Sequence, residues 1–256
     1  MARIGIFDSG SGGLSVLREI RKILPDERFI YYSDNAHCPY GEKPASYIVE
    51  RGRAVTDLLL SKGAQAVVVA CNTATAAAIA TLRAEYSVPF VGMEPAVKPA
   101  ATGTRSGVVG VLATAGTLKA PKYLNTKGQY ADAVRIVERV GQGFVELVES
   151  MELDGAHAEA VVRSSLLPLL SEGADTIVLG CTHYPFLLPL MRRIAPAGVN
   201  FIDPAPAVAR HLADVLRERG IALSDPAPGV ELLASGDDTT LKKLFTLRSC
   251  FEMSEK

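Results

Sequence analysis

The stretch AVVVACNT at residues 66–73 decides the fold, because a short apolar run ends there in a thiol and polar residues follow at once. The stretch TIVLGCTH at residues 176–183 repeats this pattern. Short runs that are apolar at nearly every position are typical of parallel strands covered on both faces. Each run therefore places its cysteine, Cys71 or Cys181, at the carboxyl end of a strand, where open α/β sheets bind their ligands.

Repeated strand–turn–helix units around both stretches predict an α/β fold. We expect two similar lobes related by a pseudo-two-fold axis, each a mainly parallel sheet flanked by helices, with the active site in the cleft between them. Chain order assigns residues 1–96 and 206–256 to the first lobe and residues 97–205 to the second. Beside the two cysteine-bearing strands, the expected strands are 3–7, 29–32, 90–93, 108–112, 134–140, 200–202 and 230–234, and the expected helices are 14–24, 47–61, 74–86, 118–129, 157–171, 186–194 and 207–219.

The composition is ordinary for a globular protein and excludes some classes of function. The 256 residues carry a net charge of −1, which gives no general attraction to nucleic acid or to anionic lipid. The first residues do not resemble a signal peptide, and no apolar run approaches the ~18–20 residues of a membrane span. We therefore expect a cytoplasmic enzyme whose four cysteines are free thiols: Cys38, Cys71, Cys181 and Cys250.

Two cysteines at equivalent strand ends favour acid–base chemistry. A single buried cysteine often only fills space. Two thiols that each end a strand, followed by polar residues, are better explained as a pair acting from opposite sides of a cleft. A thiol, with its ordinary pKa of about 8.5, needs only modest tuning to exchange protons at neutral pH.

The loop after the first strand carries Asp8, Ser9 and three glycines. In a parallel sheet, Asp8 shares an edge with Cys71 and can accept or orient its proton; alternatively, it caps the next helix. Backbone N–H groups of the loop would bind an anion. Because Ser15 occupies the last position of the G-x-G-x-x-G pattern and no P-loop lysine is present, a small carboxylate fits better than a nucleotide.

His183 follows Cys181 by two residues, so an imidazole can act as general acid or base beside the thiol. The alternative is a zinc site that includes Cys38 and His37, but these spacings differ from the usual C-x₂-C pairs, and we expect no metal. Glu149, at a helix end, either orients His183, binds a substrate ammonium group or is simply solvated. The polar residues that would together bind carboxylates and an ammonium group are Ser9, Asn72, Thr73, Thr114, Thr117 and Thr182.

Six ordered motifs resemble the glutamate racemase family and extend over most of the chain. They are GIFDSGSGGLSV at 5–16, Y-x-D-x-A at 32–36, PYGEK at 39–43, ACNTA at 70–74, GMEPA at 92–96 and GCTHYP at 180–185. The resemblance implies an enzyme without cofactor, commonly a homodimer, that interconverts L-glutamate and D-glutamate. It also implies that the enzyme supplies D-glutamate for bacterial peptidoglycan.

Carried over residue by residue, the resemblance makes Cys71 and Cys181 the acid–base thiols for the D- and L-enantiomer, respectively. Asp8 would assist Cys71, and His183, supported by Glu149, would assist Cys181. An orienting role would fall to Asp34. The positions that would hold the substrate are Asp8, Ser9, Pro39, Tyr40, Gly41, Asn72, Thr73, Thr114, Thr117, Thr182 and His183.

The chain departs from the family pattern in three places, none of them at the two thiols. His37-Cys38 replaces an Arg-Val pair often seen before Pro-Tyr-Gly, residues 141–143 stand where Cys-Pro is common, and Glu146 stands where proline is common. A related aspartate or hydantoin racemase would use the same machinery. From other classes, a non-catalytic two-lobed amino-acid-binding protein and a zinc hydrolase are the alternatives.

Overall fold

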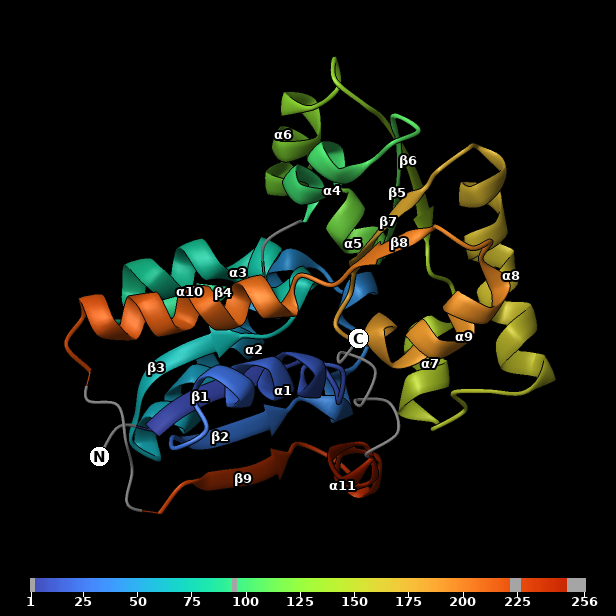
Figure 1. Cartoon of the computed structure of the whole chain (residues 1–256). Helices are drawn as coiled ribbons and strands as arrows, with labels where there is room; N and C mark the ends of the chain where they lie inside the picture. The colour runs from blue at the N-terminus through green and yellow to red at the C-terminus, as the bar shows by residue number, and fades with distance from the viewer. Residues whose placement is uncertain (1–2, 94–95, 222–226, 248–256) are drawn as a thin grey trace.

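The computed structural model describes residues 3–93, 96–221 and 227–247. Within them, two parallel sheets flanked by helices form the frame of the molecule (Figure 1). The first sheet has the strand order β4-β3-β1-β2-β9, and the second has the order β6-β5-β7-β8. The expected α/β fold with parallel sheets is confirmed.

The first sheet is centred on β1 (Arg3–Asp8), which pairs with β2 (Arg28–Ser33) on one side and β3 (Ala64–Val69) on the other. Its edges are β4 (Phe90–Gly92) and β9 (Gly229–Ala234). All five strands run in the same direction, so the residues that follow β1, β2 and β3 meet at one edge of the sheet.

The second sheet repeats this arrangement with four strands. Its inner strands are β5 (Val108–Ala113) and β7 (Thr176–Gly180), and its edges are β6 (Arg135–Val140) and β8 (Asn200–Ile202). β3 and β7, which precede the two cysteines, thus both lie inside a sheet. Apart from the exposed Gln65, all residues of these two strands are buried, which explains the apolar runs.

The helices on the first sheet divide between its two faces, as the alternation of strand side chains requires. One face packs on α1 (Leu14–Ile23) and α10 (Ala205–Glu218), which lie side by side. The other face packs on α2 (Ala45–Ser61) and α3 (Asn72–Glu85). The remaining helices are α4 (Val97–Gly103), α5 (Ala115–Leu118), α6 (Pro121–Gln129), α7 (Phe144–Glu149), α8 (Ala156–Ser171), α9 (Leu188–Ile194) and α11 (Thr239–Thr246).

Three local expectations need correction. The single helix expected over 118–129 is two, α5 and α6, because Pro121 starts a new helix after an extended Ala120. The helix expected over 186–194 begins as a 3₁₀ turn at Tyr184–Leu187. The sequence patterns did not indicate α4, α11 or the 3₁₀ turns Asn35–His37 and Tyr40–Glu42, which are too short for a clear periodicity.

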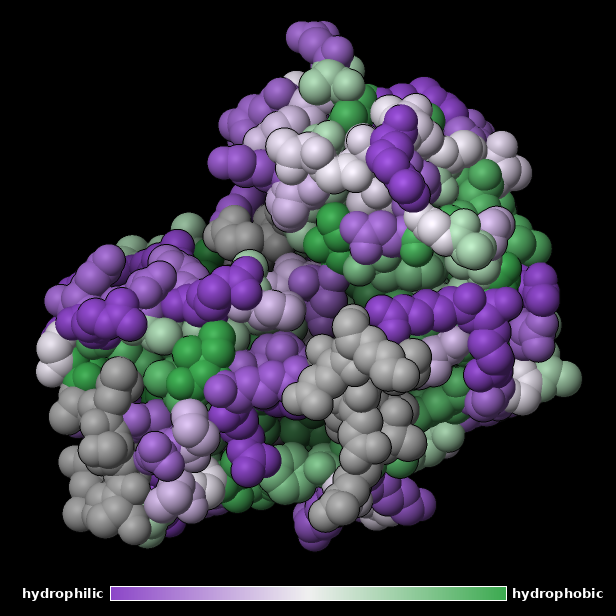
Figure 2. Space-filling view, in the orientation of Figure 1, coloured by the Kyte–Doolittle hydropathy of each residue, from purple (hydrophilic) through white to green (hydrophobic). Residues whose placement is uncertain are grey.

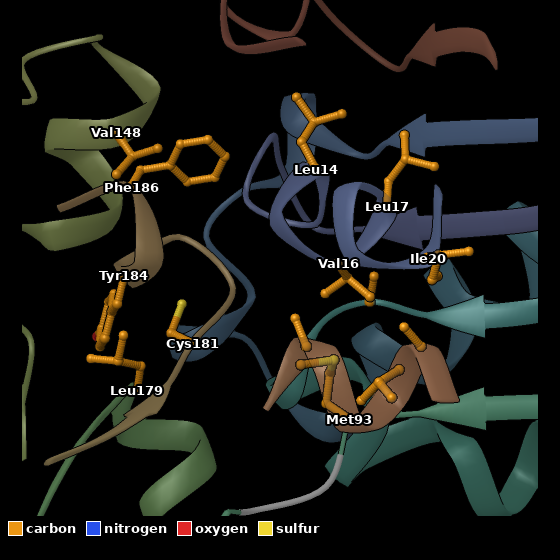
Figure 3. Packing of buried hydrophobic residues seen from close by; sticks show 14 of the residues in the cluster. Leu14, Val16, Leu17, Ile20, Met93, Val148, Leu179, Cys181, Tyr184 and Phe186 are labelled. Carbon is orange, nitrogen blue, oxygen red and sulfur yellow. The ribbon is translucent and has the colours of Figure 1, made fainter. Parts of the chain in front are cut away.

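One hydrophobic cluster joins the two sheets. It includes Leu17 and Ile20 from α1 together with Val148 and Phe186 from around the second sheet, and Cys181 lies among them (Figure 3). Polar residues are spread over both halves of the surface, with apolar groups between them (Figure 2). In the described part of the chain, no helix has the length and apolar character needed to cross a membrane.

Candidate active site

The loop between β1 and α1 buries a carboxylate at the edge of the first sheet. Asp8 is completely buried, and its Oδ2 accepts a hydrogen bond of 2.9 Å from the backbone N–H of Gly13. A Cβ on Gly13 would lie 2.8 Å from the Cβ of Asp8, so the close approach of the loop requires glycine. Asp8 Oδ1 has no hydrogen-bond partner among the described residues. Burial raises the pKa of Asp8.

Cys71 occupies the N-cap position of α3, directly after β3. Its Sγ accepts a hydrogen bond of 3.4 Å from the backbone N–H of Ala74 and lies 3.7 Å from the Oγ of Ser9. Burial raises the pKa of the Cys71 thiol, and the nearby charge of Asp8 raises it further. The hydrogen bond from the Ala74 N–H and the contact with Ser9 act in the opposite direction and lower that pKa.

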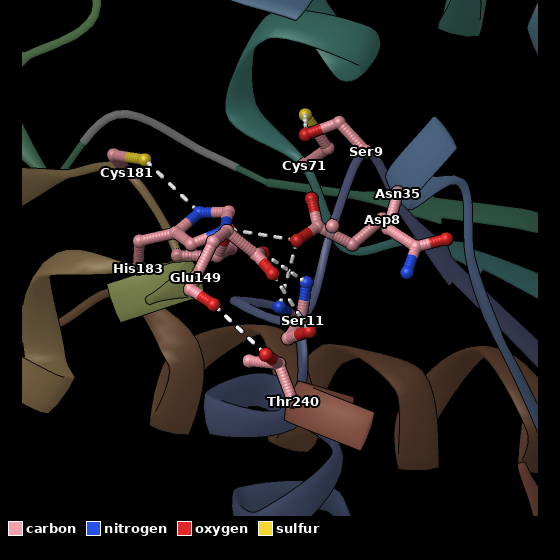
Figure 4. A network of polar contacts seen from close by, with 12 residues as sticks. Asp8, Ser9, Ser11, Asn35, Cys71, Glu149, Cys181, His183 and Thr240 are labelled. Atoms are coloured by element: carbon pink, nitrogen blue, oxygen red, sulfur yellow. Dashed lines mark hydrogen bonds and ion pairs between the residues drawn. The ribbon is translucent and has the colours of Figure 1, made fainter. Parts of the chain in front are cut away.

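Cys181, His183 and Glu149 form a chain of contacts beside the second sheet (Figure 4). Cys181 Sγ lies 3.7 Å from His183 Nδ1, and His183 Nε2 lies 2.7 Å from Glu149 Oε1. Burial alone would lower the pKa of His183, but the contacts with Cys181 and Glu149 outweigh it and hold that pKa well above its ordinary value. Burial raises the pKa of Glu149, but the hydrogen bonds from His183 and Ser11 lower it. The net result is a pKa below the ordinary value. The three residues are therefore suited to hold an imidazolium, that of His183, next to a thiol.

Two residues that the sequence patterns did not single out hold Glu149 in place. Ser11 donates to its carboxylate twice, through the backbone N–H at 2.6 Å and through Oγ at 3.1 Å. Thr240 of α11 donates to its backbone carbonyl at 2.8 Å (Figure 4). Ser11 was an unassigned position within the first motif, and Thr240 lies beyond the last motif, so no sequence signal pointed to either contact.

Hydroxyl groups that follow strands of both sheets meet at the active site. The Oγ1 of Thr114 lies 2.9 Å from that of Thr73 and 3.0 Å from that of Thr117. Across the site, Thr182 Oγ1 donates to Asp8 Oδ2 at 3.5 Å. Five predicted substrate-binding positions thus make contacts between elements far apart in the sequence.

Asp34 follows β2 at the same edge, and its hydrogen-bond partners are Arg51 and Tyr40 rather than either thiol. It is completely buried, and its carboxylate accepts two hydrogen bonds from Arg51, at 2.8 and 2.9 Å, and one from Tyr40. Burial would raise the pKa of Asp34, but these hydrogen bonds lower it below the ordinary value. The neighbouring loop brings Gly41 so close to Thr114 that a Cβ would lie 3.0 Å from that residue. Pro39 and Gly41 line a small cavity there with Thr114, and the buried Tyr40 anchors the loop between them.

Of the two remaining cysteines, Cys38 and Cys250, only Cys38 lies within the described residues. Cys38 is partly buried and lies beside the His183–Glu149 pair, where one ligand atom from each of these three residues is within 4.8 Å of the others. This is a different donor set from the one considered in the sequence, because the His37 Nδ1 instead contacts the Tyr47 hydroxyl. Cys250 lies outside the described residues.

Comparison with known proteins identifies the class. Residues 4–212 match the family described as Asp/Glu/hydantoin racemase. The glutamate racemase of Ectopseudomonas mendocina is 49% identical over 96% of this chain and 94% of its own length, and that of Pseudomonas aeruginosa is 52% identical over 88% and 86%. The structure of Escherichia coli glutamate racemase with L-glutamate and the activator UDP-MurNAc-Ala has a TM-score of 0.86 at 34% identity, covering 95% of this chain and 92% of that one.

The chain therefore belongs to the Asp/Glu/hydantoin racemase family, a family of isomerases. The resemblance to glutamate racemase, first seen in six motifs, is confirmed over nearly the whole chain. A glutamate racemase from Bacillus anthracis, RacE1, shares the fold with a TM-score of 0.84 at 32% identity, covering 95% of this chain and 92% of that one.

Proposed function

We propose that this enzyme interconverts L-glutamate and D-glutamate with two thiols, so that one proton leaves the substrate α-carbon for one thiolate and a second proton arrives from the other thiol. The observation that carries the proposal is the pairing of each thiol with its own polar partners: Cys71 with Ser9 near Asp8, and Cys181 with His183. Figure 4 shows Cys181 linked to His183 and, separately, Cys71 linked to Ser9. One thiolate removes the α-proton from one face while the other thiol protonates the opposite face.

On the L-glutamate side, His183 would hold Cys181 as a thiolate. An imidazolium at 3.7 Å stabilises the anion, and Glu149 at 2.7 Å stabilises the imidazolium in turn. When Cys181 gains the α-proton of L-glutamate, its negative charge is neutralised, and the backbone does not need to move. Glu149 thus acts through His183 and does not touch the substrate.

On the D-glutamate side, Cys71 would react through a different arrangement. The free thiol is favoured by burial, so the anion must be formed when the substrate brings its positive ammonium group. The N–H of Ala74 at the start of α3 then stabilises the thiolate, and the buried Asp8 accepts or orients the displaced proton. The two thiols therefore do the same chemistry with unlike assistants.

The carbanion-like transition state needs electrostatic stabilisation, because the α-proton of an amino acid is much less acidic than a thiol. The hydroxyls of Thr73, Thr114 and Thr117 and the unpartnered Oδ1 of Asn72 provide polar groups for the substrate. The other substrate contacts in this proposal are Asp8, Ser9, Pro39, Tyr40, Gly41, Thr182 and His183, with Asp34 fixing Tyr40. No cofactor is assigned a step.

The wider setting completes the proposal. The enzyme would work in the cytoplasm as a homodimer, supply D-glutamate for peptidoglycan, and bind neither nucleic acid nor membrane. Residues 1–96 with 206–256 would form one lobe and residues 97–205 the other, with glutamate between them. The pairing of β9 with β2 and the packing of α10 on α1 support this division.

Circular dichroism of L- and D-glutamate, each incubated with enzyme and no added cofactor, tests the proposal. Wild type should bring both solutions to zero ellipticity, and Cys71→Ser and Cys181→Ser should each lose nearly all turnover. Cys38→Ser, a matched thiol substitution outside the pair, should remain active. In D₂O, Cys181→Ser should still exchange the α-proton of D-glutamate and Cys71→Ser that of L-glutamate. Full activity in either variant of the pair would refute the mechanism, and activity on aspartate alone would refute the substrate.

A further inference from the structure

We propose that Cys38, His183 and Glu149 form an inhibitory site for a thiophilic divalent cation such as Zn²⁺. One ligand atom from each residue lies within 4.8 Å of the other two. The set combines a thiol, an imidazole and a carboxylate, which are the three side-chain donors that Zn²⁺ prefers. The inhibitory role, though not the site itself, rests on the function proposed above.

The absence of a side chain on Gly10 leaves the space that the three donors share. A Cβ built on Gly10 would lie 2.3 Å from Glu149 Oε1, 3.1 Å from Cys38 Sγ and 3.1 Å from His183 Nε2. All three atoms therefore surround one small region next to the backbone of the β1–α1 loop. Zinc requires distances of about 2.0–2.3 Å, so the donors need to move by roughly 1 Å.

The surroundings are those of a supported and accessible metal site. His183 contacts Cys181 through Nδ1, which orients the ring and leaves Nε2 for the ion. The other carboxylate oxygen of Glu149 accepts the hydroxyl of Ser11. Glu149 is 22% exposed and Cys38 is partly buried, so an ion can reach the site from solvent. Three protein ligands leave the fourth tetrahedral position to water.

Metal binding at this place opposes the proposed catalysis. The ion replaces the hydrogen bond of 2.7 Å between His183 Nε2 and Glu149 Oε1, and the protons of the Cys38 thiol and of Nε2 pass to solvent. The chain of contacts from Glu149 through His183 to Cys181, on which the proposed catalysis depends, is then broken between Glu149 and His183. Sensitivity to zinc depends on Cys38, the third ligand. This cysteine belongs to the His37-Cys38 pair, at which the chain departs from the family pattern.

Binding is tested with Co²⁺ on the full chain, through the thiolate-to-cobalt charge-transfer band. Wild type should show the band, the double variant Cys71→Ser/Cys181→Ser should keep it, and Cys38→Ser should lose it. A band that survives in Cys38→Ser, or that disappears with the two other thiols, overturns the proposal, as does the absence of any band in wild type. This readout does not depend on racemase activity.

Inhibition is tested with Zn²⁺ in the racemisation assay. The half-inhibitory Zn²⁺ concentration should rise by about tenfold or more in Cys38→Ser, since loss of even an outer-shell partner costs about 10–100-fold in metal affinity. Chelation should restore wild-type activity. Equal sensitivity of wild type and Cys38→Ser means that Zn²⁺ acts on the catalytic thiols, which refutes the inhibitory role. If no glutamate turnover is found at all, the proposed function fails while the cobalt result still decides the site.

Discussion

At the scale of single residues, the two thiols have different neighbours. Cys71 lies at a helix N-terminus near a buried carboxylate, whereas Cys181 lies 3.7 Å from an imidazole that also contacts Glu149. In the proposed reaction each face of the substrate meets only one thiol, so the two thiols can work in unlike surroundings. The contribution of Glu149 can be measured separately from that of the thiols.

Glu149→Gln should lower kcat by about 10²-fold, because the imidazolium loses its charged partner and general acid–base assistance is worth that much. The two enantiomers have equal free energy, so kcat/KM must fall equally in both directions. The α-deuterium isotope effect should nevertheless rise with L-glutamate and not with D-glutamate, because only the step at Cys181 becomes slower.

Glu146→Gln is the matched control for this substitution, one turn earlier on α7 and exposed. It should leave both the rate and the isotope effects near wild type. An equal isotope effect for the two enantiomers in Glu149→Gln would show that Glu149 is not specific to the L-glutamate side.

At the scale of elements, α2 is fixed to the active-site loop by one buried ion pair. Asp34 is completely buried and accepts two hydrogen bonds from Arg51. Arg51→Met leaves this carboxylate without its cation and should cost about 3 kcal/mol of unfolding free energy at neutral pH. The folded-state pKa of Asp34 lies below 3.8, so its stabilising contribution is present above that pH and is lost as the pH falls through the folded value.

Urea unfolding at pH 7 and at pH 3.5 checks both parts of this prediction. The difference in unfolding free energy between wild type and Arg51→Met should be smaller at the lower pH, because Asp34 becomes protonated more readily in the variant. Arg53→Met, on the same helix but in an exposed pair with Glu85, should change stability little at either pH. If this difference in unfolding free energy did not depend on pH, Arg51 would stabilise the protein through packing and not through its charge.

The β1–α1 loop is fixed by how closely it approaches the second half of the molecule. A Cβ on Gly12 would lie 2.4 Å from His183 Nδ1, so Gly12→Ala must displace the imidazole. We expect loss of nearly all activity and about 1–3 kcal/mol of stability. Gly128→Ala, in α6 with open space around it, should instead gain up to ~1 kcal/mol and keep full activity. Thermal unfolding and the racemisation assay check both variants, and an active Gly12→Ala would contradict the geometry.

The sequence predicted the elements better than the contacts between them. Apolar runs located β3 and β7 and hence both thiols, because burial of a strand leaves a local pattern. The two contacts from Ser11 to Glu149 join residues 138 positions apart, and local periodicity carries no information about such a distance. The short helix α11, which delivers Thr240 to Glu149, was missed because eight residues give no clear periodicity.

At the scale of the whole molecule, the described arrangement is closed over the active site. Cys71 is 5% exposed and Cys181 is 8% exposed. Hydrogen bonds cross from one half to the other at Ser15–Thr182, Ser11–Glu149 and Thr73–Thr114. These contacts hold the two halves together around the buried thiols.

We predict that the two halves separate in the absence of substrate and close when glutamate binds, because the substrate supplies charges that the facing polar groups otherwise lack. Small-angle scattering should give a larger radius of gyration without ligand than with saturating D-glutamate. Alkylation of Cys71 and Cys181 by iodoacetamide should become slower over the same concentration range. D-alanine, which lacks the side-chain carboxylate, should have little effect on either readout. Identical scattering with and without D-glutamate would mean that substrate enters through local loop movement, and the hydrogen bonds between the two halves would then persist throughout the cycle.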